Sequence, residues 1–357
     1  MPTASADPRR IDSLDGMRAL SIGLVLFEHS AGVTGFPLSL ATLHSTLGDL
    51  GTLGVRIFFV ISGFLITTLL IAEREKTGRV SLGGFYLRRL FRIFPAAYFF
   101  IAIVFVLDRV GVLTVMHNDF LAALTYTMNF HREKAPWMLH LWSLSVEEQF
   151  YMLWPAAMLV AGRIGAGWIA AAQILIAPIL RIITWFYFPE HRSYQEFQYV
   201  MDSIAAGCLL AIARPWLKQQ PLYCRLLASR WFFVLPIALG FTCMAAEHSF
   251  KAYMAHASIL NVGIALCIDR VVTFPTTPFG RLLNVPAIRY VGTLSYSIYL
   301  WQELFMERGS PALVQRFPLN LLCIAGMSLF SFYAIEQPAL RLRVKVSRLL
   351  SPKRAPT

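Results

Sequence analysis

The sequence has 357 residues, of which 57% are hydrophobic and only 15% are charged. A soluble domain needs more charge on its surface, so this composition excludes a soluble enzyme and favours a polytopic helical membrane protein surrounded by lipids. The net charge of +12 is explained by basic residues that keep loops in the cytoplasm. We therefore expect no nucleic-acid partner.

Apolar runs recur along almost the whole chain and predict an all-α fold of about ten transmembrane helices. Each run has about 15 to 22 residues, the length that crosses the hydrocarbon core of a bilayer. A shorter apolar piece near residues 119–130 is interpreted as an interfacial or re-entrant helix. The expected spans are 17–33, 51–72, 93–113, 142–161, 167–188, 199–213, 231–246, 253–271, 290–306 and 318–335.

Basic residues are distributed unevenly between the alternate loops of this topology. With the N-terminus inside, the cytoplasmic segments hold roughly three Lys or Arg residues for each one outside, which satisfies the positive-inside rule for an even number of spans. Both termini are therefore expected in the cytoplasm. The membrane domain is predicted over residues 1–343, and a basic cytoplasmic tail over residues 344–357.

The first expected helix carries an arginine and a histidine, Arg18 and His29, eleven positions apart. Eleven residues make about three helical turns, so both side chains lie on one face, about 16 Å apart along the axis. Ionisable groups are expensive in a bilayer and mark functional interiors. A neutral imidazole accepts a proton at physiological pH, so we expect His29 to be a general base. The alternative is a structural histidine that donates to a backbone carbonyl between helices.

The second expected helix contains an aromatic run that leads to Ser62 and Gly63. Small residues at this point allow neighbouring helices to approach closely. The functional interpretation is that Phe58, Phe59, Ser62 and Gly63 line a narrow slot for an extended ligand. Arg56, near the outer end, is interpreted as a side chain that extends its charge toward the membrane surface.

Three arginines, Arg88, Arg89 and Arg92, precede the third expected span on its cytoplasmic side. Arg89 and Arg92 are three residues apart and therefore adjacent on a helix face. Guanidinium groups hold phosphates through paired hydrogen bonds, which makes the cluster a candidate phosphate site. Topology and contact with anionic lipids are the alternative explanation.

Two glutamates, Glu147 and Glu148, are expected about one turn inside the outer end of the fourth span. A carboxylate at that depth needs a partner or water, so a purely structural role is disfavoured. Ser143, Glu147 and Tyr151 share a helix face because they are four residues apart. One of the two glutamates is a candidate to orient His29 by accepting its second ring N–H.

Asp202 and Tyr296, together with Tyr151, are candidates for contact with a substrate. Asp202 stands at the outer start of the sixth expected span, and Tyr296 lies on a polar face of the ninth. An aromatic belt at the membrane surface is the alternative explanation for Tyr296. Metal-ligand spacing is absent on every expected helix, and the five cysteines are too scattered for a disulfide framework, so no metal is expected.

These elements, in this order, resemble the acyltransferase-3 family of integral membrane acyltransferases, of the type that O-acetylates bacterial surface polysaccharides. The resemblance covers nearly all of residues 11–343. The matching pieces are the Arg18–His29 pair, FFVISGFLI, the Arg89–Arg92 pair, LWSLSVEEQFY, the segment that starts at Asp202, SYSIYLWQ and YAIEQPALRLR.

The resemblance implies an acyl-CoA donor, usually acetyl-CoA, on the cytoplasmic side of a bacterial inner membrane. The acceptor would be a hydroxyl of a glycan or lipid-linked saccharide at the outer face. The resemblance gives His29 the catalytic role, and gives Arg18, Arg89 and Arg92 donor-binding or organising roles. Gln302 stands where some relatives have histidine. Since no SGNH-type esterase domain is fused after the membrane domain, we expect a protein unlike the two-domain peptidoglycan-modifying form, and the acceptor stays open.

In the expected mechanism, the CoA phosphates bind Arg88, Arg89 and Arg92, and the pantetheine arm lies along the Arg18–His29 face. The principal alternative is a secondary transporter or flippase in which Arg18, His29 and Glu147 relay protons. That alternative predicts inverted repeats, which we do not find in the sequence.

Overall fold

The structure is a computed structural model that describes residues 11–47, 49–188, 195–246 and 250–350. Every regular element in these residues is helical, which confirms the all-α prediction. Some of the apolar helices begin and end at recognisable caps. Helix α3 (Leu50–Thr77), for example, starts where the Asp49 carboxylate accepts a hydrogen bond from the Thr52 amide, and stops at Gly78 with φ of 72°. That left-handed conformation favours glycine and terminates a helix.

Contacts divide the chain into two compact units, and helices α6 (Leu141–Tyr187) and α12 (Pro286–Trp301) supply residues to both. Unit 1 is Met1–Ala31, Pro37–Gly78 and Ala157–Ser295, and unit 2 is Gly32–Phe36, Arg79–Ala156 and Tyr296–Thr357. The other helices of unit 1 are α1 (Asp12–Ser30), α2 (Leu38–Leu47), α3, α7 (Phe197–Leu217), α8 (Pro221–Ala228), α9 (Val234–Ala246), α10 (Phe250–Thr273) and α11 (Pro278–Leu283). Those of unit 2 are α4 (Leu82–Arg109), α5 (Asp119–Leu124), α13 (Leu319–Phe330) and α14 (Gln337–Leu350).

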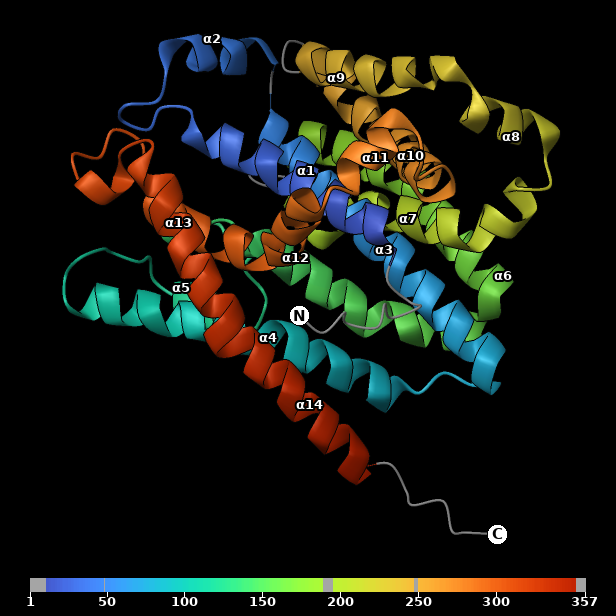
Figure 1. The fold of residues 1–357 in the computed structure, drawn as a ribbon, viewed down its shortest axis with the longest axis horizontal. Helices are drawn as coiled ribbons and strands as arrows, with labels where there is room; N and C mark the ends of the chain where they lie inside the picture. The colour runs from blue at the N-terminus through green and yellow to red at the C-terminus, as the bar shows by residue number, and fades with distance from the viewer. Residues whose placement is uncertain (1–10, 48, 189–194, 247–249, 351–357) are drawn as a thin grey trace. The chain divides into compact units, whose positions relative to one another are not determined.

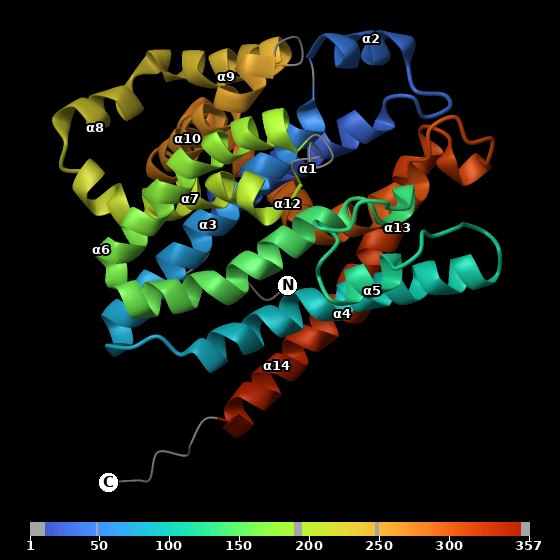
Figure 2. The ribbon, with the colours of Figure 1, turned by 180° about the vertical axis from the view of Figure 1, so that it is seen from behind.

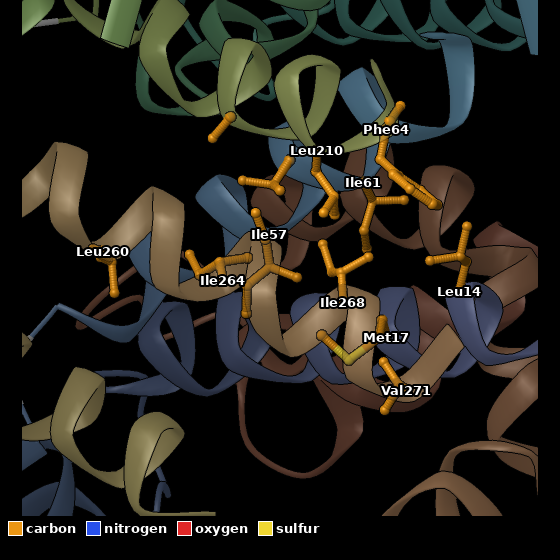
Figure 3. Packing of buried hydrophobic residues seen from close by; sticks show 14 of the residues in the cluster. Leu14, Met17, Ile57, Ile61, Phe64, Leu210, Leu260, Ile264, Ile268 and Val271 are labelled. Carbon is orange, nitrogen blue, oxygen red and sulfur yellow. The ribbon is translucent and has the colours of Figure 1, made fainter. Parts of the chain in front are cut away.

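The core of unit 1 is built from aliphatic side chains that converge from α1, α3, α7 and α10 (Figure 3). Ile61 and Ile268 are fully buried between these helices, and Leu14 and Met17 enter from α1. Because α1 packs on α3 and α10 through this cluster, the same contacts fix the helix that carries Arg18 and His29.

Helices α3 and α7 approach each other more closely than ordinary side chains permit. A Cβ atom on Gly63 would lie 2.0 Å from the Ile204 carbonyl oxygen, and one on Gly207 would lie 2.0 Å from the Val60 carbonyl oxygen. Paired glycines are how helices in membranes bring their backbones together. The small residue at position 63 is thus explained by packing.

In unit 2, the α13–α14 segment forms one long rod, with a π-helical turn (Ser331–Glu336) between its two α-helical parts. Helix α4 packs against this rod and crosses it, as both Figure 1 and Figure 2 show. The ring of Phe99 contacts Phe330, and Arg92 faces Glu336, so the two elements run antiparallel. π-helical turns are rare and occur mostly at functional sites.

Helix α6 contains the residues of the fourth and fifth expected spans. It is interrupted at Gly162, whose backbone has φ of 67° and ψ of −177°, outside the helical region. Only glycine adopts this combination without strain. The interruption coincides with the predicted gap between spans 142–161 and 167–188.

Six helical stretches among the described residues are long and apolar enough to cross a membrane, or seven if the bent pair Pro221–Ala228 and Arg230–Thr242 forms one span. The stretch Pro136–Tyr187, which holds the fourth and fifth expected spans, is one of these six. Helix α1 does not qualify because it holds four charged residues, and α12 does not because it has only 16 residues. The structure therefore supports a multi-pass helical protein, and the count of about ten and the cytoplasmic termini stay predictions.

Two boundaries differ from those expected. Helix α4 begins at Leu82, capped by the Ser81 hydroxyl, whereas hydropathy placed the span at 93–113 because the arginines interrupt the apolar run. Helix α14 continues to Leu350, so the expected start of the tail at residue 344 falls inside a helix. The remaining residues of the expected tail, 351–357, lie outside the described part.

Candidate functional site

Helix α1 presents both residues of the first motif. The Arg18 guanidinium is 3.2 Å from the Asp15 carboxylate, one turn away. The half-buried His29 ring places Nδ1 2.8 Å from the Val25 carbonyl oxygen. Because a carbonyl oxygen only accepts hydrogen bonds, Nδ1 is a protonated ring nitrogen in this contact.

Glu28, beside His29, ties the end of α1 to its neighbours. Its carboxylate accepts a hydrogen bond from the Leu50 amide at the start of α3, and lies 2.9 Å from the imidazole of His44 on α2. Gly51 leaves space for the Glu28 side chain, because a Cβ atom at position 51 would lie only 2.7 Å from it. These contacts hold the last turn of α1, and with it His29, in a fixed orientation within unit 1.

Ser62 is buried and Gly63 packs against the α7 backbone. The packing explanation therefore accounts for Gly63, and a donor-binding role for this pair stays a prediction. Arg56 differs from expectation. It is buried rather than extended to the surface, and its guanidinium donates to the Ser203 hydroxyl and the Asn261 side-chain oxygen.

Asp202 lies in a buried ion pair that the sequence did not reveal. Its carboxylate is 2.5 Å from the Arg181 guanidinium and accepts a hydrogen bond from Ser258. Arg181 also donates to the Tyr199 carbonyl. Because an arginine inside an apolar run requires such a partner, the sequence alone could have shown that Arg181 is paired. The sequence could not show that the partner is Asp202, which lies on another helix.

In unit 2, helices α4 and α6 run antiparallel in a register that corrects one expectation. The Tyr86 hydroxyl donates to the Met152 carbonyl, and further along α4 the Phe100 ring contacts His140. This register brings Glu147 and Glu148 to the level of Arg89 and Arg92. The expected separation of the arginines from the glutamates is not seen in this register, because Arg89 and Arg92 lie inside α4 and not before it.

Arg89, Tyr151 and Glu147 form a chain of contacts. The Arg89 guanidinium lies 4.5 Å from the centre of the Tyr151 ring, and the Tyr151 hydroxyl donates to Glu147 at 2.5 Å. The predicted common face of Glu147 and Tyr151 is confirmed. Ser143, on the same face, instead contacts the Tyr299 hydroxyl at 2.6 Å.

Glu148 is buried beside this chain. It interacts electrostatically with Glu147 and Arg89, and with the phenols of Tyr98 and Tyr126. One of its oxygens has no hydrogen-bond partner among the described residues. Burial, and then the charge of Glu148, raise the pKa of the Tyr126 phenol, so that side chain stays a hydrogen-bond donor.

The arginine cluster is spread along α4. Arg88 is exposed, whereas Arg92 is partly exposed and 4.0 Å from the buried Glu336 carboxylate. Glu336 also accepts a hydrogen bond from Ser297. The half-buried Tyr296 donates its hydroxyl to the Ile93 carbonyl, a contact that joins the end of α12 to α4.

Unit 2 thus gathers guanidinium groups, carboxylates and phenols at one level, and unit 1 carries the anchored imidazole. Guanidinium groups suit phosphate, and a histidine with a fixed tautomer suits proton transfer. Within the described residues, no group of three or more His, Cys, Asp or Glu side chains is arranged to hold a metal ion.

Two bacterial relatives show what the chain is similar to. The peptidoglycan O-acetyltransferase OatA of Listeria monocytogenes is 27% identical over 368 residues, which are 92% of this chain and 55% of that protein. The O-acetyltransferase OatA of Staphylococcus aureus strain MRSA252 is 27% identical over 378 residues, 98% of this chain and 60% of that protein. The chain spans a little over half the length of these relatives.

No solved structure matches the chain. A family model described as an acyltransferase domain matches residues 11–336, which is nearly the whole membrane region and holds every motif described above except the end of YAIEQPALRLR. The chain belongs to the acyltransferase-3 family.

Proposed function

We propose that this protein is a membrane O-acyltransferase that moves an acetyl group from acetyl-CoA to a hydroxyl of a glycan. The observation that carries the proposal is the family match over residues 11–336, together with relatives named O-acetyltransferases. The donor would be cytoplasmic, and the acceptor would be at the outer face of a bacterial inner membrane. Because the Listeria relative is named for peptidoglycan, a peptidoglycan sugar is the first acceptor to test.

The donor's phosphates are assigned to Arg88, Arg89 and Arg92. Arg88 is exposed and Arg92 partly so, which leaves these groups accessible to a charged ligand. Arg89 lies over the Tyr151 ring, which holds a guanidinium flat without neutralising it. Arg18, Ser62 and Gly63 remain proposed donor-binding residues, and Tyr151, Asp202 and Tyr296 remain proposed substrate contacts.

His29 is assigned the role of general base. Its Nε2 takes the proton from the acceptor hydroxyl while the hydroxyl oxygen attacks the thioester carbonyl carbon. The carbon–sulfur bond breaks, the CoA thiolate leaves, and the imidazolium returns the proton to it. General-base help is worth about 10²–10⁴ in rate.

Within unit 1, Nδ1 of His29 already donates a hydrogen bond to the Val25 carbonyl oxygen, and this bond fixes the orientation of the ring. Glu147 and Glu148 remain proposed catalytic residues. The transporter hypothesis is not favoured, because the family match is to an acyltransferase domain.

The test uses purified protein in lipid nanodiscs with acetyl-CoA and a peptidoglycan oligosaccharide, and follows CoA release and acetylation of the sugar. His29→Ala should bind acetyl-CoA but lose turnover by about 10²-fold or more. Arg89→Ala should weaken binding of acetyl-CoA. The matched controls are His117→Ala and Arg74→Ala, both at exposed positions. Near-normal turnover by His29→Ala would contradict the mechanism, and a wild-type protein without affinity for CoA would contradict the function.

A further inference from the structure

The rod of unit 2 carries a row of buried polar side chains on one face. Asn320, Ser328, Ser331 and Glu336 are all at most 1% exposed. Ser328 and Ser331 are three residues apart and share an α-helical face. Ser331 and Glu336 are five apart, which in a π-helical turn brings them to the same face, because that turn bonds residue i to i+5. The π-turn thus extends the row as far as Glu336.

The end of α12 lies opposite this row. Ser297 donates to Glu336, and one turn further on the Trp301 ring contacts Phe99, which also contacts Phe330. These contacts run antiparallel, so Trp301 and Gln302 come beside the segment that holds Ser328 and Ser331. Helix α13 also packs against the short turn that begins at Gln302. We call Trp301, Gln302, Ser328 and Ser331 the polar lane.

Every member of the polar lane has a buried polar atom that needs a partner. Indole Nε1 of Trp301, both amide atoms of Gln302, and the hydroxyls of Ser328 and Ser331 have no hydrogen-bond partner among the described residues. All four side chains are fully buried. Folded proteins pair almost all such atoms, because an unmade hydrogen bond in an apolar interior is costly. So many in one segment point to a ligand that supplies the missing bonds.

The chemistry of the lane selects the ligand. Its groups are neutral and include donors and acceptors in about equal measure, which suits a neutral chain of amides and hydroxyls better than a charged or purely apolar one. The lane begins one turn from Glu336 and Arg92, and Arg92 belongs to the cluster assigned to the donor's phosphates. A molecule with phosphates at one end and an amide-bearing arm at the other fits this order.

We propose that the polar lane binds the pantetheine arm of the acyl-CoA donor, with its secondary amides paired to Trp301, Gln302, Ser328 and Ser331. The inference rests on the proposed function, since it names a part of the donor site. It also moves the arm from the α1 face, where the sequence led us to expect it, into unit 2.

The test separates the two halves of the donor. Acetyl-pantetheine, which lacks the nucleotide, is used as a truncated donor, and adenosine bisphosphate, the nucleotide half of CoA, is used as a competitor of acetyl-CoA. The variants are Ser331→Ala and Gln302→Leu in the lane, and Arg89→Ala in the arginine cluster. The matched control is Ser21→Ala, because Ser21 is equally buried but donates to the Met17 carbonyl of its own helix.

Ser331→Ala and Gln302→Leu should raise the KM for acetyl-pantetheine about tenfold, the effect of one lost hydrogen bond, and leave inhibition by adenosine bisphosphate unchanged. Arg89→Ala should weaken inhibition by adenosine bisphosphate and leave the KM for acetyl-pantetheine unchanged. Ser21→Ala should change neither. Lane variants that use acetyl-pantetheine as well as the wild type does overturn the inference and leave the proposed function intact.

A second measurement distinguishes the ligand from a water molecule that is part of the fold. In unliganded protein, Ser331→Ala removes a hydroxyl without a protein partner, so the thermal unfolding temperature should stay the same or rise. A clear fall in that temperature with an unchanged KM shows a structural water and overturns the inference. Failure of the wild type to use acetyl-CoA at all overturns the proposed function and, with it, this site.

Discussion

Two buried carboxylates of unit 1, Asp202 and Asp269, differ in their surroundings from two of unit 2, Glu148 and Glu336. In unit 1, Asp202 is 2.5 Å from Arg181, and Asp269 is 2.6 Å from Arg214 and 2.6 Å from the Tyr223 hydroxyl. In unit 2, Glu336 lies 4.0 Å from Arg92, and one oxygen of Glu148 has no hydrogen-bond partner within the described ranges. Asp202 and Asp269 therefore join helices through close ion pairs. Glu148 keeps hydrogen-bonding capacity in the interior of unit 2.

This contrast separates stability from function. A buried charge with a close partner is destabilising to break, because the remaining charge is left in an apolar interior. A buried carboxylate without a close partner already costs free energy in the folded protein. Such a group persists where it serves a ligand or a reaction. The predictions below test that division, and the first has the largest expected effect.

Asp202→Ala should destabilise the protein most. It leaves the Arg181 guanidinium buried without its partner, at an expected cost of about 3–5 kcal/mol in the free energy of unfolding. Thermal unfolding in detergent or nanodiscs measures the change. The matched control is Asp12→Ala, which breaks the more exposed ion pair with Arg289 and should cost less than about 1 kcal/mol. Equal effects of the two substitutions would remove the basis for assigning unit 1 a stabilising role.

Gly63→Ala should have the next largest effect. The added Cβ meets the Ile204 carbonyl oxygen at 2.0 Å, so α3 and α7 must separate, at a cost of about 1–3 kcal/mol. Gly23→Ala is the control because a Cβ at Gly23 meets no atom within 4 Å. That substitution should stabilise α1 by about 0.5–1 kcal/mol. If both substitutions shift the unfolding temperature in the same direction, the close helix crossing does not determine the stability of unit 1.

Glu148→Gln should have the smallest effect on stability. The substitution keeps the shape of the side chain and removes a buried titratable group, so the free energy of unfolding should stay within about 1 kcal/mol of the wild type. Acetyl transfer should nevertheless fall about tenfold or more, because the proposed site loses a carboxyl group that positions its reacting groups. Unfolding and turnover are measured on the same preparation. A large loss of stability with normal turnover would place Glu148 with the structural carboxylates of unit 1.

Hydropathy was sufficient to predict an all-α, multi-pass fold. The predicted gap between the fourth and fifth spans coincides with Gly162. The start of α4 was missed because hydropathy treats Arg88, Arg89 and Arg92 as the end of an apolar run. A helix continues through arginines when one face of it is covered by neighbouring elements, as the contacts of Arg89 and Arg92 show.

The parts of the candidate site that depend on spacing along a single helix could be predicted from the sequence. Spacing along one helix placed Arg18 with His29 and Glu147 with Tyr151. Contacts between helices could not be predicted in this way, because they depend on register. The Arg181–Asp202 pair and the shared level of Glu148 and Arg89 both belong to this class.

The π-helical turn at Ser331–Glu336 has a consequence for how this family can vary. A π-turn contains one residue more than the α-turn it replaces, so deletion of a single residue there would restore a regular helix. The rest of the rod would then rotate by about 100° relative to α13. Glu336 would leave Ser297 and Arg92 although no contacting side chain had been replaced. In this segment, length should be under stronger selection than residue identity, the opposite of what surface loops allow.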